Sequence, residues 1–265
     1  MLYDCFTYFN EDLILDIRFN ILYDKVDYFV IIEGNRTHSG RLKKKNFNIN
    51  KFSKFKNKIK YFFIKNMPEK FSPWELENFQ RNQILIGLKG AQKNDLVLIS
   101  DCDEIPNLDS INNIQNMNND IFVFEQKFFY YKFNLLNTEA NPWYGTKLFR
   151  YNFFEKFTPQ EIRNYKAKQY PFWRIDKPKN LKIINKGGWH FSFLNSVKNI
   201  KLKLQSYAHT EFNKDFFTNE KILKNKIDNY QDLFKDNSYL KRVQLDNSYP
   251  DYIIKNKENF KKWIA

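Results

Sequence analysis

The chain has 265 residues, of which 42% are hydrophobic and 18% aromatic, a composition that excludes a disordered or fibrous protein. Its formal net charge of +14 indicates an anionic partner, which could be nucleic acid, a membrane surface or a phosphorylated substrate. Only two cysteines occur, and neither a signal peptide nor an apolar run of about 18 residues is visible, so we expect a soluble cytoplasmic protein without disulfides.

Strand and helix patterns alternate through the first hundred residues. Apolar runs predict strands at 2–6, 28–33, 59–64 and 95–100, and helical periodicity predicts a helix at 11–23. Ser72, Pro73 and Glu75 form a capping box that begins another helix, which we expect to end near Gly90. This order predicts an α/β fold with a mostly parallel, Rossmann-like sheet flanked by helices, although no glycine-rich phosphate loop is present. The basic segment 41–58 suits a solvated loop or a phosphate-binding segment.

The pattern changes beyond residue 107. Aromatic-rich strands are predicted at 121–133 and 144–151, and a second capping box begins at Thr158. A strand at 187–193 is preceded by a glycine turn, and a helix follows from 197 to 209. From residue 216 onward we expect short, charged helical pieces. The sequence thus predicts a catalytic domain at 1–215 and a helical C-terminal appendage at 216–265.

Three acidic residues follow the predicted strand at 95–100. Asp101 and Asp103, two positions apart, would point to one side of an extended backbone, at the strand end where α/β proteins bind ligands. Two carboxylates about 4 Å apart repel by roughly 4 kcal/mol at an effective dielectric near 20, and a divalent cation relieves that repulsion. The pattern therefore suggests a Mg²⁺ or Mn²⁺ site that holds a diphosphate. Taken alone, the pattern favours a strand end followed by a solvated acidic turn, so the surrounding motifs have to decide.

Other short motifs accompany the acidic one along residues 2–215. They are Tyr3-Asp4-Cys5-Phe6, Asn10-Glu11, the segment 24–33, Thr37-His38-Ser39-Gly40, Gln80-Arg81-Asn82, Ser100-Asp101-Cys102-Asp103-Glu104-Ile105-Pro106, Trp143-Tyr144-Gly145-Thr146, Gly187-Gly188-Trp189-His190-Phe191-Ser192 and Ser206-Tyr207-Ala208-His209-Thr210-Glu211. In this order they resemble glycosyltransferase family 17, the β-1,4-mannosyl-glycoprotein β-1,4-N-acetylglucosaminyltransferases, and more broadly the GT-A glycosyltransferases with their DxD motif.

The resemblance implies a GT-A fold, a UDP-sugar donor (UDP-GlcNAc first), inverting transfer and a Mn²⁺ or Mg²⁺ cofactor. The acceptor would be a hydroxyl of a glycan or lipid-linked glycan. Eukaryotic members of the family carry a membrane anchor, whereas none is visible here. We therefore expect surface-glycan synthesis at the cytoplasmic face of a membrane, with peripheral contact between the basic protein and anionic lipids. Another nucleotide sugar would be the alternative donor.

Candidate site residues follow from the pattern and the resemblance together. The expected metal ligands are Asp101, Asp103 and His190, although a lone histidine on a strand is as often a core residue. The expected donor contacts are Asn10, Glu33, Arg81, Asp101, Trp143 and Trp189. Glu33 also suits a plain strand end, Arg81 a helix-surface ion pair, and at least one of the tryptophans the core.

An inverting transfer needs a base that deprotonates the acceptor hydroxyl. Glu211, which follows the helix after the His190 strand, is the first candidate, with His209 beside it and Glu104 as the second candidate. His209 could instead stabilise the end of that helix. A different class of function, a nucleic-acid-binding protein, would use the basic charge and interleaved aromatics. It would leave the acidic and Gly-Gly-Trp-His motifs unexplained, so no nucleic-acid partner is expected.

Overall fold

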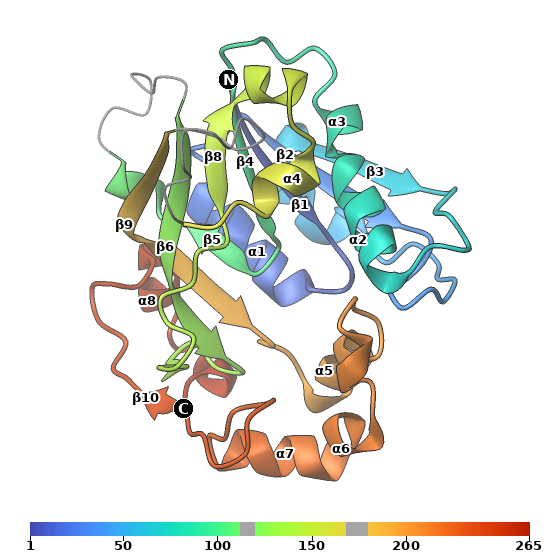
Figure 1. Ribbon diagram of the computed structural model, residues 1–265. Helices are drawn as coiled ribbons and strands as arrows, with labels where there is room; N and C mark the ends of the chain where they lie inside the picture. Colours follow the sequence, from blue (N-terminus) through green and yellow to red (C-terminus); the bar gives the residue numbers. More distant parts are fainter. Residues whose placement is uncertain (112–119, 168–179) are drawn as a thin grey trace.

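The computed structural model describes residues 1–111, 120–167 and 180–265, which form a ten-stranded sheet with helices on both faces (Figure 1). Eight strands follow the order β10-β7-β6-β8-β4-β1-β2-β3, while β9 pairs with both β5 and β6. The strands are β1 Leu2–Thr7, β2 Tyr28–Gly34, β3 Ile59–Ile64, β4 Leu96–Asp101, β5 Glu104–Pro106, β6 Ile121–Tyr130, β7 Leu135–Leu136, β8 Lys147–Arg150, β9 Leu181–Ser192 and β10 Lys241–Arg242.

The first four strands form a parallel part of the sheet. β1 lies between β2 and β4, and β3 pairs with β2, all in parallel register. This confirms the order of elements predicted for the first hundred residues. The sheet as a whole is mixed, however, since β8 runs antiparallel to both β4 and β6. The prediction of a mostly parallel sheet is therefore correct for β1 to β4 and for the pair of β6 and β9, while the other pairs are antiparallel.

The side chains of each strand alternate between the two faces of the sheet, and helices pack on both faces. Phe6 of β1 faces one core, which also contains α1 (Asp12–Leu22) and α8 (Asp251–Lys255). Cys5 faces the opposite core, which contains α3 (Ile84–Gly87) and α4 (Pro159–Arg163). Because neighbouring residues of a strand point to opposite faces, one apolar run supplies side chains to the cores on both faces of the sheet. α2 (Pro73–Asn82) precedes α3 and contacts it.

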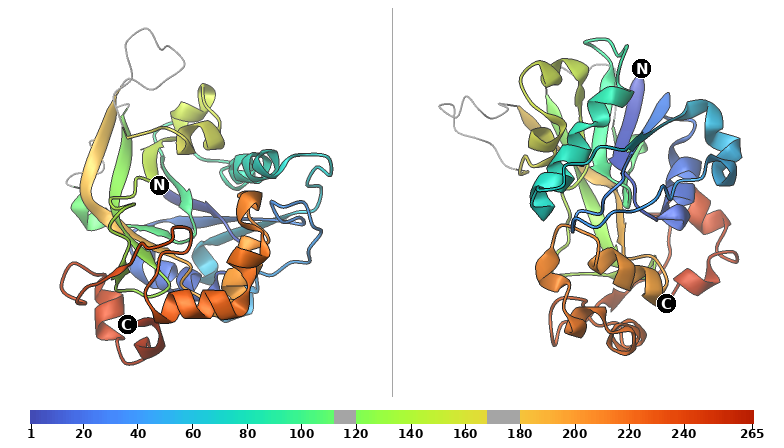
Figure 2. Two further views of the ribbon diagram at one scale, coloured as in Figure 1. Left: turned by 60° about the horizontal axis from the view of Figure 1, so that its bottom comes forward. Right: turned by 90° about the vertical axis from the view of Figure 1, so that its right-hand side faces the viewer.

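A third core lies at the end of the molecule opposite the N-terminus (Figures 1 and 2). It joins the ends of β6 and β9 to α5 (Val197–Leu204) and α7 (Glu220–Asp228), with α6 (Asp215–Thr218) between them. The segment predicted as an appendage contributes to two cores, since Leu223 and Leu233 enter this one while Tyr249, Ile253 and Phe260 enter the core beside α1. No helix of the described residues is long and apolar enough to cross a membrane.

Several predicted boundaries are wrong, because packing between elements far apart in the sequence affects where helices and strands end. The helix after Ser72 ends at Asn82 and resumes as α3, and the helix predicted to reach residue 209 ends at Leu204. The predicted strands at 121–133 and 144–151 are shortened to β6 and β8. The capping boxes at Ser72 and Thr158 are confirmed, because they depend only on hydrogen bonds between residues three apart.

The predicted glycine turn before residue 187 is part of a longer strand. β9 runs through Gly187 and Gly188 with a register shift against β6. Gly188 has φ +136°, and a Cβ there would lie 2.2 Å from the carbonyl oxygen of Ile105. The glycine therefore allows β5 and β9 to approach each other, and a side chain would separate them.

The basic segment at 41–58 is partly helical and anchored in the core. Residues Ile49–Lys58 form a 3-10 helix, and the rings of Phe47, Phe52 and Phe55 are buried beside α1. The interleaved aromatics are thus core residues, while most of the lysines between them are exposed.

Candidate active site

The acidic motif forms a turn at the carboxyl end of β4. Asp101 is the last residue of β4, Cys102 and Asp103 form the turn, and Glu104 begins β5 directly opposite His190 of β9. The extended backbone assumed for the motif is therefore wrong. Asp101 and Asp103 instead have separate sets of partners, because the chain reverses between them.

A buried arginine of α1 holds this turn from below. The Arg18 guanidinium, fully buried, forms an ion pair with the equally buried Asp4 of β1. Its Nη1 atom donates hydrogen bonds to the carbonyl oxygens of Asp101, Cys102 and Glu104 at 3.1, 3.2 and 2.7 Å. The shape of the acidic turn is thus fixed by a side chain about 80 residues earlier in the sequence.

Two arginines neutralise Asp101. Arg81 of α2 lies 2.7 Å from Oδ1, and Arg163 of α4 lies 3.0 Å from Oδ2. Burial favours the neutral acid, but Arg163 and Arg81 outweigh it and hold the pKa of Asp101 well below its ordinary value. Both carboxylate oxygens are therefore engaged by cations of this chain. These contacts argue against Asp101 as a direct metal ligand.

Glu104 is buried and fully paired. Its Oε1 atom accepts hydrogen bonds from Arg163 and from the indole of Trp143, both at 2.6 Å, while Oε2 accepts from the Asp101 amide. A Cβ at Gly145 would lie 2.1 Å from Oε1, so the carboxylate packs directly on backbone. A base must reach the acceptor hydroxyl, and this side chain has no exposed surface. These contacts argue against Glu104 as a catalytic base and favour a role in positioning Trp143 and Arg163.

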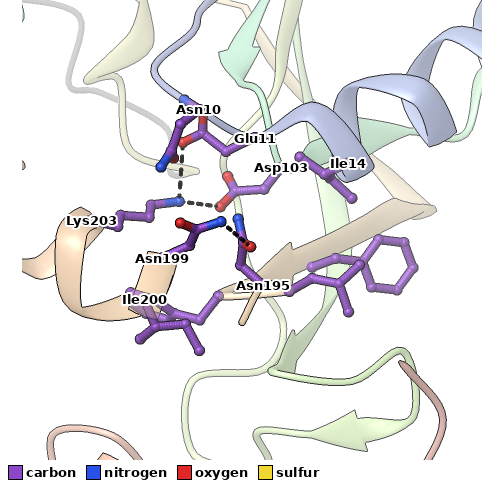
Figure 3. Close-up of a pocket in the computed structure, with 11 residues that line it drawn as sticks. Asn10, Glu11, Ile14, Asp103, Asn195, Asn199, Ile200 and Lys203 are labelled. Atoms are coloured by element: carbon purple, nitrogen blue, oxygen red, sulfur yellow. Dashed lines mark hydrogen bonds and ion pairs between the residues drawn. The ribbon is translucent and has the colours of Figure 1, made fainter. Parts of the chain in front are cut away.

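Asp103 lies at a pocket that the sequence did not reveal (Figure 3). Lys203 of α5 reaches across this pocket and places Nζ 2.9 Å from Oδ2 of Asp103 and 3.7 Å from Oε1 of Glu11. Asn10 lines the same pocket, and Asn195 and Asn199 complete its polar side. A donor contact by Asn10 stays a prediction. Burial opposes ionisation of Asp103, but Lys203 and His190 lower its pKa below the ordinary range. Asp103 is thus a carboxylate at neutral pH.

His190 packs between aromatic rings beside Asp103. Its Nε2 atom lies 3.4 Å from Oδ1 of Asp103, and its ring stacks on Phe128 at a centroid distance of 4.4 Å. Its Nδ1 atom is buried and has no hydrogen-bond partner within the described part of the chain. A metal-bound histidine normally donates its second N–H to an acceptor, which His190 lacks there. Its role as a ligand stays a prediction, and its contacts favour positioning of Asp103.

The available ligand atoms decide which kind of metal site these residues fit. Within residues 1–111, 120–167 and 180–265, no group of three or more His, Cys, Asp or Glu side chains is arranged to hold a metal ion. Mg²⁺ does not require such a cage, because it takes one or two carboxylates, several waters and substrate phosphate oxygens. Asp103 offers one ionised carboxylate to this second kind of site, but its two oxygens already face Lys203 and His190. A cation held by Asp103 together with a diphosphate therefore stays a prediction.

The remaining predicted donor contacts divide between the site and the core. Trp143 packs against His190 at a centroid distance of 5.0 Å and is part of the site. The indole of Trp189 is buried in the core on the other face of β9, with its N–H donated to the Ser248 carbonyl, which argues against contact with a donor. The carboxylate of Glu33 is fully buried and accepts from Tyr61 and from the backbone of the basic segment. It anchors that segment, and a donor contact by Glu33 stays a prediction.

Glu211 and His209 lie on the surface beyond α5. Nδ1 of His209 is 2.7 Å from Oε1 of Glu211, and about half of each side chain is exposed. The hydrogen bond from His209 lowers the pKa of Glu211, so this carboxylate is ionised at neutral pH. No contact between this pair and Asp103 is present among the described residues. A catalytic role for Glu211 and His209 stays a prediction.

Sequence reasoning missed the cations that surround the acids: Arg18, Arg163 and Lys203. Arg18 had a usable signal, because it lies on the apolar face of the predicted helix together with Ile14 and Ile17, where an unpaired charge is not tolerated. Lys203 and Arg163 had none, since the abundance of lysine concealed the first and the second lies in an ordinary capped helix.

A buried lysine next to this site predicts a pH-dependent stability. Lys147 is fully buried and donates hydrogen bonds to the carbonyls of Tyr144 and Gly145 at 2.6 and 2.9 Å. Burial and the neighbouring Arg163 lower its pKa from 10.5 to about 7. Between pH 7 and pH 10.5 the unfolded chain binds a proton that the folded protein does not, so the free energy of unfolding rises with pH in that window.

Lys147→Met is therefore expected to lose this rise. Urea unfolding at pH 7 and pH 9.5 should show wild type gaining stability over the variant as the pH increases. Lys44→Met, at an exposed position, is the matched control and should run parallel to wild type. Parallel curves for Lys147→Met and wild type would show that Lys147 stays charged in the folded protein throughout this range.

The class of the protein follows from the comparison with family models: this fold and its acidic turn belong to a glycosyltransferase. The model of glycosyltransferase family 17 matches residues 1–264, and the chain therefore belongs to glycosyltransferase family 17. The comparison with curated proteins gives no match. The family decides between the two classes of function weighed from the sequence, because it is a family of enzymes that transfer sugars.

Proposed function

We propose that this glycosyltransferase has a GT-A-type catalytic domain and transfers GlcNAc from UDP-GlcNAc, with inversion, to a hydroxyl of a glycan or lipid-linked glycan. The observation that carries the proposal is the pocket at the end of β4, where Asp103 and Lys203 meet beside Asn10. Ligands of α/β proteins bind at this edge of the sheet. The sugar and the nucleotide are proposed from the family resemblance.

The chain's own residues can perform two tasks in such a transfer. Lys203 and Arg81 place positive charge beside the carboxylates, where a leaving diphosphate needs it. Glu211, ionised and exposed, is the proposed base that accepts the proton of the attacking hydroxyl, with His209 orienting it. A divalent cation held by Asp103 would supply further neutralisation of the diphosphate.

The place of the reaction is proposed as the cytoplasmic face of a membrane. The net charge of +14 and the exposed lysines of the basic segment support attraction to anionic lipids, where a lipid-linked acceptor would be found.

Hydrolysis of nucleotide sugars in the absence of an acceptor tests donor and metal together. We expect UDP-GlcNAc to be hydrolysed with Mn²⁺ or Mg²⁺, faster than UDP-glucose, and EDTA to abolish the reaction until the metal is restored. UDP with Mn²⁺ should also raise the melting temperature. Full activity in EDTA would contradict the metal site, and turnover of GDP- or CMP-sugars alone would contradict the proposed donor.

A further inference from the structure

An exposed tryptophan begins the helix that leads to the acidic turn. Trp74, in the first turn of α2, is 47% exposed, although a large aromatic side chain of this kind is usually mostly buried. Its ring meets the ring of His209 edge-on, at a centroid distance of 4.6 Å and an interplanar angle of 83°. Two segments more than a hundred residues apart, teal and orange in Figure 1, therefore form one surface.

One side of α2 leads from Trp74 to the residues that hold Asp101. Trp74 and Arg81 are seven residues apart, which is about two helical turns and about 10 Å along the axis, so both side chains lie on the same side. Glu77 lies between them and binds Arg81 at 2.8 Å, and Arg81 in turn binds Asp101. An extended ligand that contacts Trp74 would thus point toward the acidic turn.

The polar groups around Trp74 match the chemistry of a sugar. The ionised Glu211 accepts hydrogen bonds and His209, depending on its tautomer, donates or accepts them. Pyranose rings present C–H groups on their faces and hydroxyls on their edges. An exposed indole flanked by a carboxylate and an imidazole offers an apolar face and polar edges in the same arrangement, as ligand sites with a few orienting polar groups do.

Tyr207 lies beside this surface, on the short segment between α5 and His209. Its ring lies 5.5 Å from that of His209, and its hydroxyl is buried without a hydrogen-bond partner among the described residues. Burial raises the pKa of Tyr207, and the carboxylate of Glu211 and the ammonium of Lys203 both act on it, in opposite directions. The tyrosine thus lies within electrostatic reach of both the surface pair and the proposed donor pocket.

We propose that Trp74, beside His209 and Glu211, forms the binding site for the sugar ring of the acceptor glycan that carries the reacting hydroxyl. This inference rests on the proposed function, because it concerns the acceptor, which is the second substrate of the same active site. It assigns Trp74 a role that neither the sequence motifs nor the family match contains.

The test uses a glycan array that carries oligosaccharides ending in mannose, glucose, galactose or N-acetylglucosamine. The wild-type protein is expected to bind at least one of them, and Trp74→Ala should weaken the affinity for the best-bound glycan about tenfold or more, as loss of a tryptophan anchor typically does. Phe71→Ala is the matched control: Phe71 is 43% exposed and close by in sequence, but its ring packs on Phe79. That variant should bind like wild type.

Hydrolysis of UDP-GlcNAc without acceptor separates this inference from the proposed function. Trp74→Ala should hydrolyse the donor at the wild-type rate. Trp74-dependent glycan binding without any donor hydrolysis would support the glycan site and contradict the proposed donor. An array on which nothing is bound, or on which Trp74→Ala and Phe71→Ala bind equally well, would overturn the inference.

Discussion

Asp103→Asn is expected to reduce sugar transfer by about 10²- to 10³-fold, the usual cost of removing one electrostatic group from an active site. The substitution keeps the size of the side chain but removes the charge that faces Lys203 at 2.9 Å. The proposed cation would lose its carboxylate ligand, and Lys203 would be left with Glu11 as its acidic partner at 3.7 Å. Metal and UDP affinity should therefore fall together with the rate.

The measurement combines turnover with calorimetric titration of UDP in the presence of Mn²⁺. Asp109→Asn is the matched control, because Asp109 lies in the segment that follows the same acidic turn and its side chain is 75% exposed and pairs with Lys25 at the surface. That variant should keep wild-type turnover and UDP affinity. A folded Asp103→Asn protein that turns over within a few-fold of wild type would exclude Asp103 from the site.

Arg18→Met is expected to lower the free energy of unfolding by about 3–5 kcal/mol, the usual cost of removing one partner of a buried ion pair. Asp4 would be left charged, fully buried and without its guanidinium, and the carbonyls of the acidic turn would lose their donor. A loss of this size is a large part of the stability of an ordinary domain. Thermal and urea unfolding measure it.

The double variant Asp4→Leu with Arg18→Met separates stability from the position of the turn. Replacement of a whole buried ion pair by apolar residues is often neutral or stabilising, so this variant should recover much of the lost stability. Transfer should remain low, because no side chain then holds the carbonyls of Asp101, Cys102 and Glu104. Recovery of activity along with stability would show that the turn keeps its shape without Arg18.

These two predictions concern different ways in which one turn is stabilised. Arg18 fixes its backbone from within the core, whereas Lys203, Arg81 and Arg163 neutralise its side chains from three other helices. From the sequence we expected a divalent cation alone to neutralise the carboxylates of this turn. In the structure, cations of the chain already carry much of it, so a metal would act with Lys203 on the donor diphosphate rather than merely relieve repulsion between Asp101 and Asp103.

The sequence by itself determined the features that depend on neighbouring residues. The first four strands, α1 and both capping boxes follow from apolar runs, helical periodicity and hydrogen bonds between residues three apart. The position of the acidic motif at the end of β4 follows in the same way, and the ordered motifs were sufficient to indicate the family that the comparison then showed.

Only the tertiary structure decided which side chains meet. Lys203 reaches Asp103 across 100 residues of sequence, and Arg163 reaches Asp101 across 62. Such pairs leave no periodic signal, because their partners come from different elements whose packing depends on the whole core. The same reason separates Trp143, which faces the site, from Trp189, which faces the core: both are aromatic residues near a strand, and only the register and the face of the sheet distinguish them.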